Sequence, residues 1–102
     1  MTEQELQKRN KRDIQSVLST VQGRRLLWRV LHSAQIDQHG FVPGDPSATA
    51  FHCGQKSIGL YLMALLEECS PGICGQLRAE YRTQVEARQQ EINRQQEEIS
   101  NE

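Results

Sequence analysis

Apolar residues recur at intervals of three and four along most of this sequence, and this is the periodicity of an α-helix. Charged residues before the first apolar run extend the same helix toward Glu3. We expect Ser19 or Thr20 to cap the next helix and Gly23 to accommodate the bend between the two. The sequence therefore predicts an all-α fold that begins with a solvated, basic helix. The first apolar run consists of Ile14, Val17, Leu18 and Val21.

A second helix is predicted over residues 23–34, where the only tryptophan lies among three arginines. At helical spacing, Arg24, Arg25 and Arg29 cannot all share the apolar face of this helix. The block therefore attaches a basic surface to a helix that helps to form the core. The apolar face comprises Leu27, Val30, Leu31 and Ala34.

The periodicity disappears over residues 35–48, where Pro43 and Pro46 lack backbone N–H groups and restrict the residues before them. This segment is predicted to be a long loop. Ser47 or Thr49 is expected to cap a third helix, which is the most hydrophobic part of the chain and the expected centre of the core. The predicted buried stripe of this helix is Phe51, Ile58, Leu62, Leu65, Leu66 and Cys69.

A fourth helix is predicted to start with Ser70 as its N-cap and Pro71 at its first position, where the missing N–H costs nothing. Its first part offers Ile73, Leu77 and Tyr81 for packing. Beyond that point the helix is too polar to hold itself against a small domain, so it should project into solvent or bind another chain. Apolar residues recur there every seven residues with polar residues at the alternate positions, which is the pattern of a sparse coiled-coil seam. These apolar residues are Val85, Ile92 and Ile99.

We accordingly expect a small domain of three or four helices over residues 1–81, including the loop 35–48, and a polar helical extension over residues 82–102. A chain of 102 residues suffices for one domain. Residues 8–29 hold seven Lys or Arg and one Asp, whereas residues 80–102 hold six Glu and three Arg. The molecule is therefore electrically polar, and it can meet an acidic partner with one part and a copy of itself with another.

No apolar run approaches the roughly 18 residues of a membrane span, and the first 20 residues are too charged for a signal peptide. We expect a soluble protein with no membrane contact, made in a cytoplasm. The odd number of cysteines, three, argues against a disulfide framework and favours reduced thiols.

The residues that carry chemistry do not form a convincing catalytic or metal site. His52 and Cys53 are adjacent, so on a helix their side chains point about 100° apart, which suits a nucleophile pair poorly. Cys69 and Cys74 with one histidine have loose spacing for zinc, and no second short-spaced pair completes the set. A phosphate-binding glycine loop is also missing. We expect no enzymatic activity, no cofactor and no metal.

Two interpretations of the basic residues remain open. They form either a surface for a partner protein or DNA, or a solvated face that pairs with acidic residues of the same fold. Trp28 likewise is either a core anchor against Gly54 and Gly59 or an exposed anchor for a partner. The candidate docking residues are Arg24, Arg25, Arg29, Lys8, Arg9, Lys11 and Arg12.

Two blocks at a defined separation resemble a family of small proteins of tailed phages, whose named member comes from a Bordetella phage. The first block is residues 14–31, with the pattern Gly-Arg-Arg, two apolar residues, Trp-Arg, and the second is residues 49–60, with Phe, Gly and an apolar-Gly-apolar ending. The resemblance covers about residues 13–80. Here His52, Cys53 and Lys56 stand where acidic and arginine residues are more usual in the family.

The resemblance implies a virion protein encoded among the head and tail genes of short-tailed phages, without catalytic residues. We therefore expect a non-enzymatic structural component made in the host cytoplasm, a homo-oligomer near the portal or inside the head that docks on other virion proteins, with packaged DNA as a further candidate contact. Its extension would contact a neighbouring copy or another protein through Val85, Ile92 and Ile99. The alternatives are an internal protein ejected with the DNA, a scaffolding protein and a small helical DNA-binding regulator.

Overall fold

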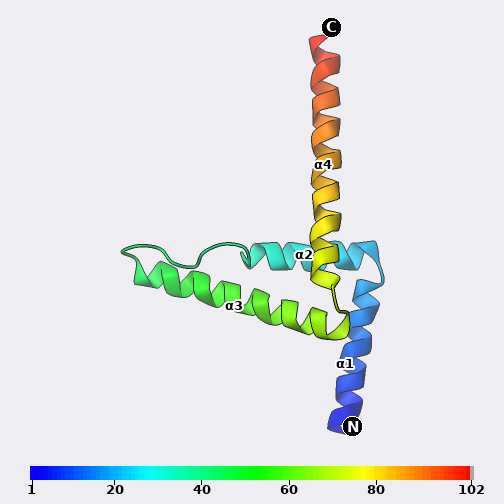
Figure 1. The fold of residues 1–102 in the computed structure, drawn as a ribbon, viewed down its shortest axis with the longest axis vertical. Coiled ribbons are helices and arrows are strands. Elements are labelled where there is room, and N and C mark those ends of the chain that lie inside the picture. The colour runs from blue at the N-terminus through cyan, green and yellow to red at the C-terminus, as the bar shows by residue number, and fades with distance from the viewer. Residues whose placement is uncertain (102) are drawn as a thin grey trace.

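The computed structural model describes residues 1–101, which contain four α-helices and no strand (Figure 1). The prediction of an all-α fold with a long C-terminal helix is confirmed. The third helix and the fourth are joined by a turn of three residues, whereas twelve residues separate the second from the third. The helices are α1 (Glu3–Leu18), α2 (Val21–Ser33), α3 (Pro46–Cys69) and α4 (Ile73–Ser100).

The helices form a thin, branched molecule. Helices α2 and α3, with the loop between them, make an arm, and α1 and α4 project in opposite directions from one end of that arm (Figure 1). The principal extents are 67 × 43 × 19 Å and the radius of gyration is 18.6 Å. A compact domain of this length has a radius of gyration of about 13 Å. The fold is therefore much more open than a typical globular domain.

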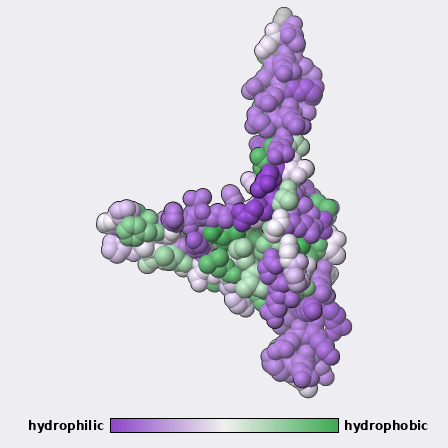
Figure 2. Space-filling model, viewed as in Figure 1, coloured by the Kyte–Doolittle hydropathy of each residue, from purple (hydrophilic) through white to green (hydrophobic). Residues whose placement is uncertain are grey.

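The core lies where the four helices meet. Its most deeply buried side chains are Leu31 from α2, Leu66 from α3 and Leu77 from α4, and Leu18 joins them from the end of α1. The projecting ends of α1 and α4 are hydrophilic, whereas hydrophobic side chains gather at the junction and along the arm (Figure 2). No helix in the described residues is long and apolar enough to cross a membrane. Burial at one junction therefore holds together a molecule whose ends are solvated.

Helices α1 and α2 start as their sequences predict. Thr2 and Glu5 form a reciprocal capping box at α1, and Thr20 caps α2 by accepting a hydrogen bond of 2.9 Å from the Gly23 N–H. The role of Gly23 differs from the prediction, because this residue lies inside α2 and not at the bend. A Cβ atom there would stand 1.9 Å from the Val17 carbonyl oxygen. Gly23 therefore permits the first turn of α2 to touch the end of α1.

Helix α3 begins earlier than predicted. The Asp45 side chain accepts a hydrogen bond of 3.0 Å from the Ala48 N–H, and Pro46 occupies the start of the helix, so neither Ser47 nor Thr49 is the cap. Thr49 instead holds the loop, since its hydroxyl accepts from the Val42 N–H at 2.9 Å and also donates to the Val42 carbonyl. The predicted loop is correspondingly shorter at its C-terminal end.

The predicted buried stripe of α3 is partly wrong. Leu66 is buried and Leu62 packs against the core, but Phe51 and Ile58 are exposed. Helix α3 turns Gly59 toward α2, where an added Cβ would lie 2.6 Å from side-chain atoms of Ala34 and Ile36. The close approach predicted at Gly59 is confirmed, although it involves these two residues and not Trp28. Gly54 faces open space, and Leu65 and Cys69 are half-buried.

The start of α4 is also different from the prediction. Ser70 is the C-cap of α3, Pro71 lies in the turn, and the N-cap of α4 is Gly72 in a left-handed conformation with φ 85°. The Glu67 carboxylate on α3 accepts hydrogen bonds from the N–H groups of Gly72 at 2.7 Å and Cys74 at 3.0 Å. These bonds hold the pKa of Glu67 below its usual value. A side chain of the preceding helix therefore satisfies the free N–H groups of α4.

Candidate docking site

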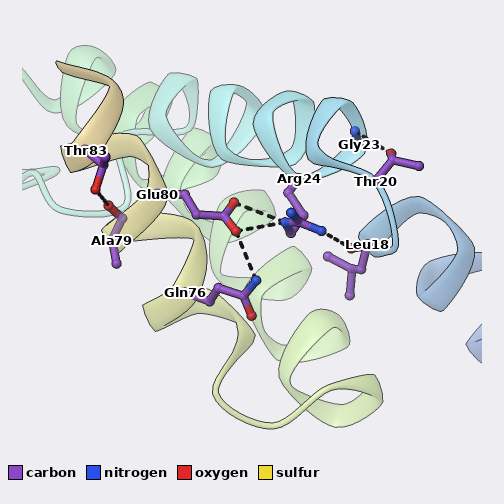
Figure 3. A network of polar contacts seen from close by, with 8 residues as sticks. All are labelled: Leu18, Thr20, Gly23, Arg24, Gln76, Ala79, Glu80 and Thr83. Carbon is purple, nitrogen blue, oxygen red and sulfur yellow. Dashed lines mark hydrogen bonds and ion pairs between the residues drawn. The ribbon is translucent and has the colours of Figure 1, made fainter. Parts of the chain in front are cut away.

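The arginine block lies on α2 as predicted, and its first arginine is an internal structural residue. The Arg24 Nε donates to both carboxylate oxygens of Glu80 on α4, at 3.0 and 3.1 Å, and its Nη1 donates to the Leu18 carbonyl at 2.9 Å (Figure 3). Gln76 donates to the same Glu80 carboxylate at 3.0 Å. Gln76 first, and Arg24 with it, holds the pKa of Glu80 below its usual value. Arg24 therefore joins α1, α2 and α4, and it is the arginine of the block that pairs within the fold.

Trp28 is buried, as the interpretation of this residue as a core anchor requires. Its ring lies 5.5 Å from the ring of Tyr81, and the Arg78 guanidinium lies 5.4 Å from the Trp28 ring centroid. Asp37 holds that guanidinium with two hydrogen bonds, which lowers the pKa of Asp37. The partners of Trp28 thus come from α4 and not from the glycines of α3.

The other two arginines of the block are exposed and line a small cleft between α2 and α4. The cleft has a volume of about 200 Å³ and is mostly apolar. Within residues 1–101 neither Arg25 nor Arg29 forms an ion pair. A mostly apolar cleft lined by two arginines that form no ion pair among residues 1–101 suits an acidic protein segment. The cleft is lined by Arg24, Arg25, Trp28, Arg29, Leu77, Glu80, Tyr81 and Gln84.

The basic residues of α1 lie on a different part of the molecule. Lys8, Arg9, Lys11 and Arg12 are all exposed on α1, the helix that projects away from the arm in Figure 1. Lys8 and Lys11 line an open groove of about 890 Å³ between α1 and the end of α3, together with Leu65 of α3. The structure therefore divides the predicted basic surface into two separate sites.

The three apolar residues of the predicted seam, Val85, Ile92 and Ile99, lie on the projecting part of α4. Every described residue from Tyr81 onward is exposed, and Glu102, the last residue of the predicted extension, lies outside the described residues. Arg94 forms ion pairs with Glu91 at 2.6 Å and with Glu98, which support the helix along its surface. The seam therefore has no partner among residues 1–101.

The side chains considered for catalysis and metal binding are dispersed. His52 is half-buried and Cys53 exposed, while burial raises the pKa of the Cys74 thiol to about 11. The described residues contain no group of three His, Cys, Asp or Glu side chains arranged to hold a metal ion. Cys74 is therefore an unreactive core residue at neutral pH.

Sequence reasoning missed the acidic partners that organise the site. Each of these acidic side chains binds a group from another helix or from the turn before α4, and no local sequence motif indicates such a pairing. They are Glu80, Asp37 and Glu67. Asp45 is different, because an N-cap residue directly before proline is a recognisable helix start.

Comparison with known proteins assigns the chain to a family. The family model described as Bbp19-like phage protein matches residues 14–72, which is more than half of the chain. The match runs from the end of α1 through α2 and α3, and includes both blocks that carry the resemblance. No curated protein and no solved structure gives a significant match. The chain belongs to the family of Bbp19-like phage proteins.

Proposed function

We propose that this phage protein is a non-enzymatic structural component of the virion, present in several copies near the portal or in the head interior, where it docks on other virion proteins. The observation that carries the proposal is the amount of surface left open. The chain exposes 7835 Å², whereas a compact monomer of 11.7 kDa exposes about 5,900 Å². Assembly with other chains would bury such an excess.

The exposed features match the two kinds of contact that a virion component requires. Arg25 and Arg29 at the apolar cleft fit an acidic surface on another protein. The seven-residue recurrence of Val85, Ile92 and Ile99 fits a helix of a neighbouring copy or of another protein. The described residues thus offer separate surfaces for different neighbours.

The shifted carboxyl groups support a structural role. The pKa values of Asp37, Glu67, Glu80 and Glu91 are all lowered, and in each case the first cause is a hydrogen bond that holds the fold or a helix surface. A general acid or base would instead need a pKa moved toward neutrality.

Mass spectrometry of purified virions tests the proposal directly. We expect the chain in mature particles in several copies, and its absence would contradict the proposal. An ejected protein would be lost from particles that have released their DNA, and a scaffolding protein would be present in immature heads but absent from mature ones. A portal-bound protein would remain through both transitions.

The cleft is tested with a pair of charge-matched variants. The double variant Arg25→Gln, Arg29→Gln should leave the domain folded, because both side chains are exposed. It should lower incorporation into particles at least about tenfold, because two charged contacts at an interface are lost. Arg9→Gln with Arg12→Gln removes the same charge from α1 and should change incorporation little. Equal losses in both variants would indicate that total charge matters and that the cleft does not.

Contact with DNA is a second candidate, which the four exposed cations on projecting α1 favour. A gel shift with duplex DNA at two salt concentrations tests it, because phosphate contacts weaken binding steeply as salt increases. Neutralising Lys8, Lys11 and Arg12 should then abolish the shift. Absence of any shift at low salt would remove DNA as a partner and leave the docking on protein unaffected.

A further inference from the structure

The outer face of α3 is apolar and uncovered. Phe51, Ile58 and Tyr61 expose 66%, 67% and 65% of their surface, whereas the side of the helix that carries Gly59 and Leu66 faces the core. A helix that is hydrophobic on all sides is normally buried on all sides. Helix α3 is buried on one side only, so its exposed apolar face is suited to a further contact.

The residues of this face follow a heptad pattern, in which Leu65 at the C-terminal end is half-buried beside α1. The intervals between them alternate between three and four over fifteen residues, which spans about 21 Å of helix. Lys56 is the one charged residue in this stretch, and its Nζ donates to the Gln38 carbonyl at 3.1 Å in the loop. The seam residues themselves are therefore uncharged and suit an apolar helix, with Lys8 and Lys11 of α1 at the C-terminal end beside Leu65. The α3 seam consists of Phe51, Gly54, Ile58, Tyr61 and Leu65.

No contact among residues 1–101 explains Gly54 in the middle of the α3 seam. A Cβ atom there would meet nothing within 4 Å, unlike one at Gly23 or Gly59. A glycine inside a helix costs about 1 kcal/mol relative to alanine. An exposed glycine between two large apolar residues is accounted for by the close approach of a second helix, whose larger side chains occupy the space above Gly54.

We propose that the α3 seam is the contact between two copies of this chain, paired antiparallel about a two-fold axis near Ile58. In this arrangement Gly54 of each copy faces the large side chains around Ile58 and Tyr61 of the other. This contact goes beyond docking on other virion proteins. It rests on the proposed multi-copy role only in that it names the surface that two copies share.

The charge at the end of the α3 seam selects the antiparallel orientation. Glu68 is exposed and continues the heptad pattern at the C-terminal end. An antiparallel pair keeps the two Glu68 side chains far apart, each toward the N-terminus of the partner's α3, which the Asp45 carboxylate already caps. A parallel pair would place the two Glu68 side chains beside each other, and like charges at a close contact are unfavourable.

The area available suits a reversible dimer. The three large exposed side chains offer roughly 400 Å² per copy, and the smaller neighbours bring the interface to about 1,000 Å² in total, at the lower limit for specific association. We therefore expect a dissociation constant in the micromolar range. Such an interface persists where copies are concentrated by assembly in a particle.

Sedimentation velocity of the full chain from about 1 to 200 µM tests the α3 seam, because this range brackets a micromolar dissociation constant. Ile58→Glu should weaken dimerisation at least about a hundredfold by burying two facing charges. Leu26→Glu, which changes an apolar side chain 56% exposed on α2, should leave it unchanged. Circular dichroism should show that both variants retain the helical fold.

Cysteine crosslinking then tests the orientation, in a Cys53→Ser background that removes the exposed native thiol. Ile58→Cys should form an intermolecular disulfide, whereas Phe51→Cys should not, because the axis places the two Phe51 positions far apart. Efficient crosslinking through Phe51→Cys would overturn the antiparallel arrangement.

Three outcomes would overturn the α3 contact itself: a monomer at every concentration, a dimer lost in Ile92→Glu but retained in Ile58→Glu, or a monomer that binds lipid vesicles through α3. Because these measurements use purified protein, they are independent of whether the chain is found in virions. A dimer with no chain in virions would contradict the proposed function alone.

Discussion

At the scale of single residues, two glycines in similar helical positions have opposite roles. We expect Gly23→Ala to lower the free energy of unfolding by at least about 2 kcal/mol, because a Cβ atom 1.9 Å from the Val17 carbonyl oxygen forces the first turn of α2 away from α1. Gly54→Ala should raise it by about 0.5–1 kcal/mol through helix propensity alone. Urea denaturation at low concentration measures both, and a stable Gly23→Ala variant would contradict the close contact.

The three arginines of the block should also separate by their effect on stability. Arg24→Ala removes the partner of a half-buried Glu80 and leaves the Leu18 carbonyl without its donor, so we expect a loss of about 1–3 kcal/mol. Arg25→Ala alters an exposed side chain and should change stability by less than about 0.5 kcal/mol. Equal effects of the two substitutions in thermal unfolding would argue against the internal role of Arg24.

At the scale of elements, the start of α4 depends on a carboxylate from α3. The pKa of Glu67 lies below its ordinary value of 4.5, first because the Gly72 N–H donates to it and then because the Cys74 N–H does. A lowered pKa in the folded state contributes stability that is present above pH 4.5 and is lost as the pH falls through the folded pKa.

Glu67→Gln should therefore be less stable than the native chain at neutral pH, and the difference should shrink as the pH falls below 4.5. Protonation of Glu67 in the native chain removes the same charge that the substitution removes. Thermal unfolding at a series of pH values measures the difference. A gap between the two chains that persists unchanged into acid would show that the charge of Glu67 does not support α4.

The helices themselves were largely predictable from the sequence, whereas their rotation was not. The apolar spacing of residues 14–18 and the cap at Thr20 are local signals that correspond to the structure, whereas Val21 belongs to α2 and is exposed, as is Val17. Helix α3 is apolar on two sides, so its periodicity does not say which side is buried. That choice depends on Gly59 meeting Ala34 and Ile36, which are distant in the sequence.

The same limit applies to the candidate site. Composition indicated a basic block and suggested that it was one surface, but the partner of Arg24 is 56 residues away along the chain. Only the crossing of α2 and α4 shows that Arg24 pairs within the fold, whereas Arg25 and Arg29 form no ion pair among residues 1–101. Long-range pairing of this kind leaves no mark in a single sequence.

At the scale of the whole molecule, the residues that stabilise the fold are different from the exposed residues that are available for assembly. The core uses residues up to Leu77, with Tyr81 packing beside Trp28, while the projecting part of α4 is exposed along its whole length. Removing that part should not reduce the cooperativity of the core. The exposed helix should instead fray at its own, lower temperature, because most helical stability in proteins comes from packing of one face, and this part packs on nothing among residues 1–101.

We therefore expect a chain that ends at Val85 to keep the unfolding temperature of the full protein within about 2 °C. The fluorescence of Trp28, the only tryptophan and a core residue, measures this transition. A chain that ends at Gln76 loses Leu77 and Glu80 and should not fold.

In the full chain, far-UV circular dichroism should also show a shallow loss of helix before the Trp28 transition, and this early phase should disappear in the shortened chain. Coincident transitions by both probes in the full chain would mean that α4 is held along its length. Because no described residue supplies such a contact, coincidence would point to a partner copy on the Val85, Ile92 and Ile99 seam. Dilution would then separate the two transitions again, since only an intermolecular contact depends on concentration.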